Sequence, residues 1–148
     1  MFDRRELLAG WRTLCGAPAP PLEVVEFWNR DFTSSCSEQT IRAVRGARAD
    51  FTDGLQFWIK SMEAIDWYEA EPHFTTYAEA ALCEPITAAE FAAVVREYSC
   101  SLVPPLPPFL LDLVGWRGGL RMYGEWNDVA VIAELADSFV LFTWGTSA

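Results

Sequence analysis

Apolar residues near the start of the chain repeat with the period of a helix, at positions Leu7, Leu8, Trp11, Leu14 and Cys15. Asp3 and Glu6 precede them with the spacing of a capping box, in which two side chains satisfy free N–H groups at a helix start. Gly16 is placed to end this helix, because glycine readily adopts the backbone conformation found after a last turn. Three prolines between Ala17 and Pro21 then prevent helical continuation.

The same period predicts two further helices. Beyond Asp53, apolar residues recur every three or four positions, which favours a helix, whereas an alternation from Leu55 to Ile59 leaves a strand as the alternative. Thr87 and Glu90 again have capping-box spacing. They stand ahead of a complete apolar face made of Phe91, Val94, Val95 and Tyr98. This last segment carries the fullest set of helix signals in the chain.

Three shorter segments give less complete patterns. Val24 to Trp28 is compatible with a short helix or a strand, and Ser37 to Val44 is expected to add one or two helical turns. Thr76 and Glu79 repeat the capping-box signature, which predicts a short helical piece over Ala80 to Cys83.

The pattern changes after Val103 to Pro108, where four prolines in five positions predict a rigid, extended connector. Beyond it the apolar residues form short or alternating runs, separated by turn residues, at Leu120–Tyr123, Val129–Ala133 and Phe139–Trp144. We therefore expect an α+β fold in which N-terminal helices pack on a C-terminal antiparallel β-meander. Residues 1–148 are expected to form a single domain, with a helical region over about 1–100, the connector at 103–108 and a β-rich region over about 120–145.

Length and charge exclude several classes of protein. The chain has 148 residues, and 21 acids against 11 bases give a net charge of −10, which argues against binding to nucleic acid. The charged residues between Asp3 and Arg12 interrupt any apolar core of a secretory signal. No uncharged apolar run approaches the roughly 18 residues of a membrane span. We therefore expect a cytoplasmic protein without a membrane segment.

The cysteines do not predict a metal site. Cys15, Cys36, Cys83 and Cys100 lie 21, 47 and 17 positions apart, and the chain has a single histidine. A structural zinc site needs closely spaced ligand pairs, so neither a metal nor another cofactor is expected. The thiols are interpreted as free, and as buried or partly buried.

Catalytic motifs are equally sparse. His73 stands beside Pro72 in what is predicted to be an exposed turn, and no serine or cysteine is marked as its nucleophilic partner. Gly115, Gly118 and Gly119 match no phosphate-binding loop and indicate a hinge or turn. The protein is therefore not expected to be an enzyme. A small hydrolase or carbohydrate-binding domain stays open as an alternative, because paired carboxylates and aromatic side chains suffice for that chemistry.

Charge is distributed unevenly, and this is the strongest functional signal. Residues 1–60 carry eight acids and eight bases, whereas residues 61–95 carry seven acids and no base. Aromatic residues are interleaved with these acids, and aromatic anchors ringed by charge are typical of rapidly associating protein interfaces. The candidate partner-binding residues are Glu63, Asp66, Trp67, Tyr68, Glu69 and Glu71. A solvated acidic face that serves solubility is the alternative.

In its size, acidity and tryptophan content, and in the ending Trp126–Ile132 followed by Phe139–Trp144, the chain resembles small bacterial immunity proteins. That resemblance implies a protein that neutralises a cognate toxin effector by covering its active or substrate-binding site. The partner would be a protein with a basic surface, and the sequence does not indicate an oligomeric state. An acidic nucleic-acid mimic or a phage-type inhibitor would share these features.

Overall fold

An antiparallel six-stranded sheet forms the middle layer of the protein in the computed structural model, which describes residues 1–33, 38–65 and 71–146, with side chains of the last range from residue 75. The strands follow the spatial order β1-β2-β6-β5-β4-β3. Their bounds are β1 (Glu23–Phe27), β2 (Gln39–Ala47), β3 (Glu84–Pro85), β4 (Gly118–Glu125), β5 (Asp128–Glu134) and β6 (Ser138–Thr146). The C-terminal strand β6 thus lies near the centre and joins the early strands to the late ones.

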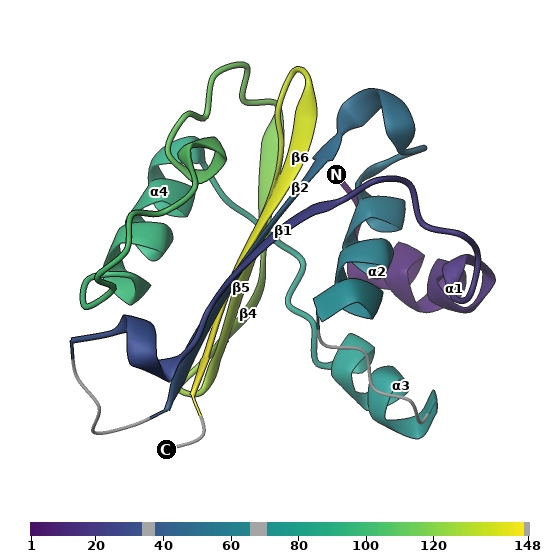
Figure 1. Ribbon diagram of the computed structural model, residues 1–148. Coiled ribbons are helices and arrows are strands. Elements are labelled where there is room, and N and C mark those ends of the chain that lie inside the picture. Colours follow the sequence, from purple (N-terminus) through teal and green to yellow (C-terminus); the bar gives the residue numbers. More distant parts are fainter. Residues whose placement is uncertain (34–37, 66–70, 147–148) are drawn as a thin grey trace.

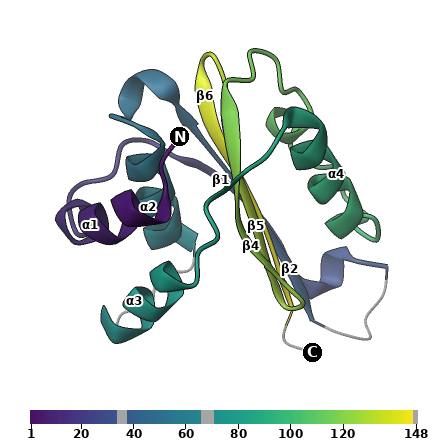
Figure 2. The ribbon, with the colours of Figure 1, turned by 180° about the vertical axis from the view of Figure 1, so that it is seen from behind.

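Helices cover both faces of this sheet. Helices α1 (Arg4–Leu14), α2 (Gly54–Ile65) and α3 (Glu71–Glu79) lie on one face, and α4 (Ala88–Tyr98) lies on the other (Figures 1 and 2). The fold is α+β, with most helices in the N-terminal part and most strands in the C-terminal part. In the described residues, none of these helices is long and apolar enough to cross a membrane.

Local capping signals place the helix starts where the sequence predicted them. The backbone N–H of Glu6 donates to the Asp3 carboxylate at 2.8 Å, and α1 begins at the next residue after Asp3. At α4 both capping-box bonds are present, 3.1 Å from the Glu90 N–H to the Thr87 hydroxyl and 3.0 Å from the Thr87 N–H to the Glu90 carboxylate. The helix predicted beyond Asp53 is confirmed as α2, so the strand alternative there is wrong.

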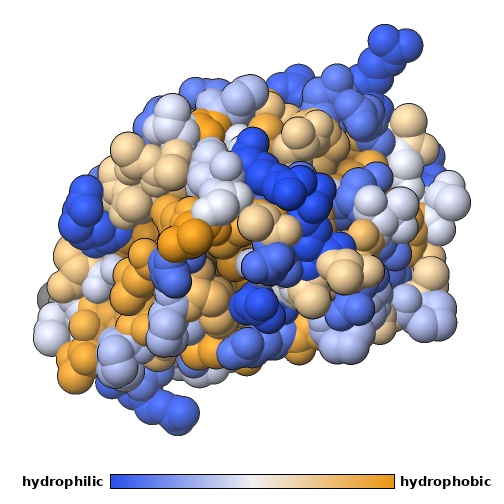
Figure 3. Space-filling view, turned by 90° about the horizontal axis from the view of Figure 1, so that it is seen from above, coloured by the Kyte–Doolittle hydropathy of each residue, from blue (hydrophilic) through white to orange (hydrophobic). Residues whose placement is uncertain are grey.

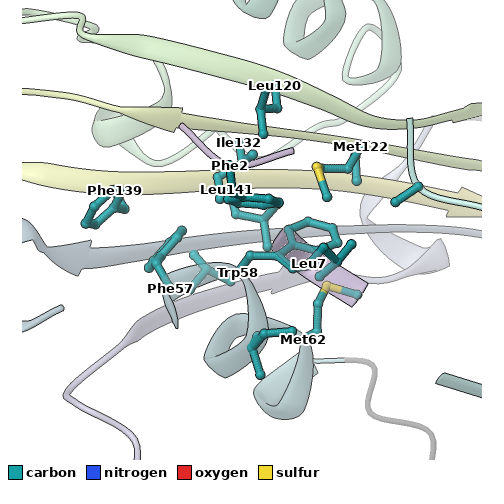
Figure 4. Close-up of a cluster of buried hydrophobic side chains, with 14 of the residues drawn as sticks. Phe2, Leu7, Phe57, Trp58, Met62, Leu120, Met122, Ile132, Phe139 and Leu141 are labelled. Atoms are coloured by element: carbon teal, nitrogen blue, oxygen red, sulfur yellow. The ribbon is translucent and has the colours of Figure 1, made fainter. Parts of the chain in front are cut away.

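Two separate cores explain the continuous apolar runs of the late strands. In β6, Phe139 and Leu141 point into a core shared with α1 and α2, whereas Val140 and Phe142 point into a core shared with α4. The first core is shown in Figure 4, where the Phe57 ring of α2 stacks on Phe139 at 5.4 Å. Because both faces are buried, these strands lack the apolar–polar alternation that an antiparallel sheet usually shows.

The helical prediction for Ser37 to Val44 is wrong, because residues from Gln39 onward form strand β2. This strand pairs over its whole length with β6, so a long-range pairing overrides the local preference. The Val24 to Trp28 segment forms strand β1 as far as Phe27. The region of about 1–100 therefore contains strands as well as helices.

The short helix predicted over Ala80 to Cys83 is also wrong. Helix α3 ends at Glu79, so Thr76 lies inside a helix and does not cap the start of one. The chain is already extended beyond Ala81, where the N–H of Leu82 donates to the Met122 carbonyl at 2.9 Å.

The proline-rich connector runs along the α4 face. Its N-terminal end is fixed by a 2.8 Å bond from the Val103 N–H to the Asp31 carbonyl, and its last proline starts the 3-10 turn Pro108–Leu110. Leu106 and Phe109 pack against the α4 core, which confirms the packing predicted for them. Gly115 then turns the chain with a φ of 76°, as the turn prediction required, whereas Gly118 begins strand β4.

Candidate partner-binding surface

The predicted partner-binding residues fall largely in a part of the chain that cannot be compared with the prediction. Asp66, Trp67, Tyr68 and Glu69 lie outside the described residues. Glu71 opens helix α3, but its side chain lies outside them too. These positions stay a prediction, and Glu63 is the member of the set whose side-chain contacts are described.

Glu63 takes part in a partly buried ion pair. Its carboxylate lies 3.1 Å from the ammonium group of Lys60, whose side chain is fully buried. The same ammonium donates to the carbonyls of Leu14 and Ala17, each at 2.6 Å. All three ammonium protons therefore have acceptors, and the bond to Leu14 ties the end of α1 to α2. Glu63 thus balances a buried charge, which is a structural task.

Other acids of the base-free segment do face solvent. Glu79 ends α3, Glu84 lies in β3, and Glu90 lies in the first turn of α4, and all three are exposed. Hydrogen bonds from the backbone and side chain of Thr87 lower the pKa of Glu90, so this carboxylate is fully ionised at neutral pH. The described part of the segment thus presents negative charge outward.

A strongly exposed tryptophan follows the end of strand β4. Strands β4 and β5 pair as far as Glu125 and Asp128, and the two-residue turn between them carries Trp126, whose exposed fraction is 71%. Leu82 is also exposed and lies beside the end of β4, 3.9 Å from where a Cβ on Gly124 would be. We call the exposed residues Leu82, Glu125 and Trp126 the hairpin tip; exposed Glu79 lies three residues before Leu82 in the chain.

Three contacts and one backbone turn fix the chain around Leu82. The Tyr123 hydroxyl donates to the Tyr77 carbonyl at 2.6 Å, and the two tyrosine rings stack at 4.1 Å, which fixes α3 against the end of β4. The Arg4 guanidinium donates to the Ala81 carbonyl at 2.9 Å. Cys83 adopts a φ of 48°, which turns the chain from Leu82 into β3. The position of Leu82 is therefore set by the fold.

A polar hollow of about 250 Å³ lies on the same face of the sheet as α2 and α3. Ile65 and Tyr77 both line it. The predicted partner-binding residues 66–71 lie between these two in the sequence. Its sheet wall includes Arg42, whose Nε lies 3.9 Å from the Glu26 carboxylate. The Arg42 guanidinium also lies over the ring of Trp28, with 5.3 Å between them, and Trp28 is half exposed.

A separate apolar area covers the α4 side. Val103, Leu111 and Val114 are exposed aliphatic residues, and Val114 reaches an exposed fraction of 78%. Figure 3 shows apolar side chains gathered on that side. Sequence reasoning treated this stretch as a packed connector. Its signal was a run from Val103 to Trp116 in which Asp112 is the single charge.

Three of the acids that line other hollows are engaged in structural bonds. Asp3 and Asp53 accept backbone N–H groups at the starts of α1 and α2, at 2.8 Å and 2.9 Å. Glu134 accepts a 3.0 Å bond from Arg48. His73 lies in α3, so the turn predicted there is wrong, whereas its predicted exposure concerns a side chain outside the described residues.

The thiols are only partly as predicted. Cys15 and Cys83 are partly buried, as predicted, and the Cys83 thiol is free, whereas Cys100 is exposed, which corrects the expectation for that residue. Cys36 lies outside the described residues. Burial raises the pKa of the Cys83 thiol to about 11, so this group is a poor nucleophile at neutral pH. Within the described ranges, no three His, Cys, Asp or Glu side chains are grouped in a way that could hold a metal ion.

Comparison with known proteins gives no relative: no family model, curated protein or solved structure matches this chain significantly.

Proposed function

We propose that this protein acts by binding another protein, and that it is an immunity protein that neutralises a bacterial toxin effector in the cytoplasm. The observation that carries the proposal is the hairpin tip, where Trp126 and Leu82 are exposed and exposed Glu125 precedes Trp126 in the chain. Binding of this exposed tryptophan in a partner's pocket would remove apolar area from water, which stabilises the complex. Tryptophan is also among the residues most often found as central anchors of interfaces.

Charge supports a basic partner. The net charge is −10, and residues 61–95 contribute seven acids without a base. Such a field accelerates encounter with a positively charged cleft and repels other acidic proteins. A narrow turn between two paired strands can enter a concave active site that a flat surface cannot fill. Occlusion of a substrate-binding cleft therefore needs no catalytic group and no cofactor on this chain.

Two alternatives use other parts of the same surface. A nucleic-acid mimic or phage-type inhibitor would rely on its carboxylates more than on Trp126, and duplex DNA would compete with it for the target. A small hydrolase or carbohydrate-binding domain would instead use the polar hollow that Arg42 lines. Turnover of a glycosidase, esterase or phosphatase substrate, lost on replacement of one carboxylate, would establish the hydrolase and refute the binder.

The direct test uses the genes that flank this one. The immunity role predicts that the gene immediately upstream encodes a toxin. Co-expression of this protein is then expected to restore growth of cells that produce that toxin. A flanking metabolic operon, or a toxin that stays active at saturating inhibitor, would contradict the immunity role.

Variants then locate the interface on that pair of proteins. Trp126→Ala is expected to raise the dissociation rate and to cost on the order of 2 kcal/mol or more of binding free energy. Glu79→Lys with Glu125→Lys is expected mainly to slow association, and the effect should vanish as salt screens the charges. Glu97→Lys is the control, because Glu97 is an exposed acid on α4, across the sheet from α3. Equal effects from Glu97→Lys would place the binding surface elsewhere.

A further inference from the structure

The two edges of the sheet differ in the length of their outermost strands. At one edge the outermost strand, β3, has two residues, flanked by bonds from the Leu82 N–H to the Met122 carbonyl at 2.9 Å and from the Ile86 N–H to the Gly119 carbonyl at 3.0 Å. Such a short edge strand offers little backbone to another chain. At the other edge, β1 pairs with β2 through all five of its residues and is the outermost strand. Throughout the described ranges, no chain segment bonds to the outer side of β1. Five residues of backbone are left as a template for another strand.

The usual protections of an edge strand are weak in β1. Its register with β2 is continuous, without a bulge, and no proline lies within the strand. Its two acids, Glu23 and Glu26, stand directly opposite Arg45 and Arg42 of β2. These arginines offset the negative charge that would otherwise keep a second strand away.

We propose that two copies of this chain pair through β1 in an antiparallel arrangement, so that one sheet continues across both copies. A two-fold axis at Val25 sets Val25 against the partner's Val25, Val24 against the partner's Glu26, and Glu23 against the partner's Phe27. Every glutamate then faces an apolar residue of the other copy, and no two glutamates are opposed. The strand is thus complementary to itself, which a two-fold interface requires.

Exposed apolar side chains of β1 favour this pairing. Val24 and Trp28 are exposed. They lie on the face that carries Glu26 and Arg42, because Glu26 pairs with Arg42 and the Trp28 ring lies under the Arg42 guanidinium. The same register places Trp28 against the partner's Leu22, and Leu22 packs at the margin of the α1–α2 core. Pairing therefore covers apolar area as well as backbone groups.

The pairing is independent of the proposed function. The β4–β5 turn belongs to the opposite half of the sheet, so the hairpin tip stays free in each copy. Loss of toxin binding in Trp126→Ala would leave self-association unchanged, and a monomeric variant would still bind one toxin per copy.

The test is sedimentation equilibrium over a roughly thousandfold range of protein concentration, because self-association follows mass action. The unmodified protein is expected to shift from monomer to dimer. Val24→Glu places a second carboxylate against the partner's Glu26 and is expected to raise the dissociation constant about tenfold, since the pair occurs twice in the dimer. Val24→Lys places a cation there and is expected to lower it.

Matched controls separate this interface from the apolar area beside α4. Leu111→Glu and Leu111→Lys make the same changes of net charge at an exposed position of that area. They are expected to leave the dissociation constant unchanged. Circular dichroism melting confirms that every variant is folded. A monomer at all concentrations, equal responses to Val24→Glu and Val24→Lys, or dissociation by the Leu111 variants would each overturn the proposal.

Discussion

At the scale of single residues, Lys60 is the most consequential side chain. It is the one lysine of the chain, it is buried, and its ammonium holds the Leu14 and Ala17 carbonyls together with Glu63. Lys60→Met would leave two carbonyls and a carboxylate without their donor. We expect it to lower the free energy of unfolding by about 3 kcal/mol or more, as loss of one partner from a buried ion pair does.

Urea unfolding at neutral pH measures this loss. Arg5→Met is the control, because Arg5 is exposed in α1 and its removal changes the net charge equally. A Lys60→Met variant as stable as the control would mean that the ammonium contributes nothing to the fold.

Ser61, the next residue of α2, gives a prediction of opposite sign. Its hydroxyl is buried and has no hydrogen-bond partner among the described residues. Burial of an unpaired hydroxyl is unfavourable, so Ser61→Ala is expected to raise the free energy of unfolding by about 0.5–1 kcal/mol. A higher melting temperature in differential scanning calorimetry would confirm it, whereas a lower one would show that the hydroxyl is bonded after all.

The site illustrates what a sequence can say about single residues. Glu63 was predicted to meet a partner because it belongs to the segment of acids without a base. Tertiary packing places its carboxylate beside the buried Lys60. Trp126 was not among the predicted partner-binding residues, although it stands beside the turn residue Asn127. Trp126 is exposed because it lies in the turn between β4 and β5, whose last pair is Glu125 with Asp128. The position of that turn follows from the strand pairing.

At the scale of elements, a helix or strand was predicted correctly where the residues that determine it are close in the sequence. The start of α4 depends on Thr87 and Glu90, three residues apart, and was predicted correctly. Strand β2 depends on a partner nearly a hundred residues later, since Ala47 pairs with Ser138, and was predicted as helix. Its buried residues lie on both faces, so no alternation marked it as a strand.

The capping box of α4 gives a pH-dependent prediction. Hydrogen bonds from Thr87 lower the folded-state pKa of Glu90 below its ordinary value of 4.5. The unfolded chain therefore binds this proton more readily, and the box stabilises the fold above pH 4.5, an effect lost as pH falls through the folded-state pKa. Glu90→Gln is expected to be less stable than the unmodified protein at pH 7, with the difference narrowing below pH 4. Thermal melts across that range measure it, and a difference independent of pH would contradict the assignment.

Strand β2 is also where an added methyl group should do most harm. A Cβ on Gly46 would lie 2.4 Å from a ring carbon of Phe51 and 3.2 Å from the Phe57 ring, inside the first core. Gly46→Ala is expected to lower the free energy of unfolding by about 1–3 kcal/mol, as overpacked cores do. Gly118→Ala is the control, because no atom lies within 4 Å of its added carbon. Equal denaturant midpoints would show that the Phe51 ring yields freely.

At the scale of the whole molecule, composition and period were enough for the fold class. Helical spacing dominates the first part of the chain and short apolar runs dominate the last, a pattern that is typical of α+β proteins. The arrangement of the helices on the two faces of the sheet could not be predicted. Helix α4 lies on one face and the other helices on the opposite face, and the helical pattern does not indicate which face a helix covers. The partner surface was predicted only as a segment, since charge counts identify a segment and the fold decides which side chains point outward, and that segment stays a prediction.

The central place of β6 has a consequence for synthesis on the ribosome. Strand β2 finds its inner neighbour only when residues 138–146 have emerged. At translation rates of about 5–20 residues per second, roughly 5–20 s pass after β2 is made before that strand is available. During this interval a β1–β2 hairpin stands with both edges open. Nascent chains arrested before Ser138 should therefore be cut readily by protease and engaged by chaperones, and protection should appear abruptly once β6 has left the exit tunnel.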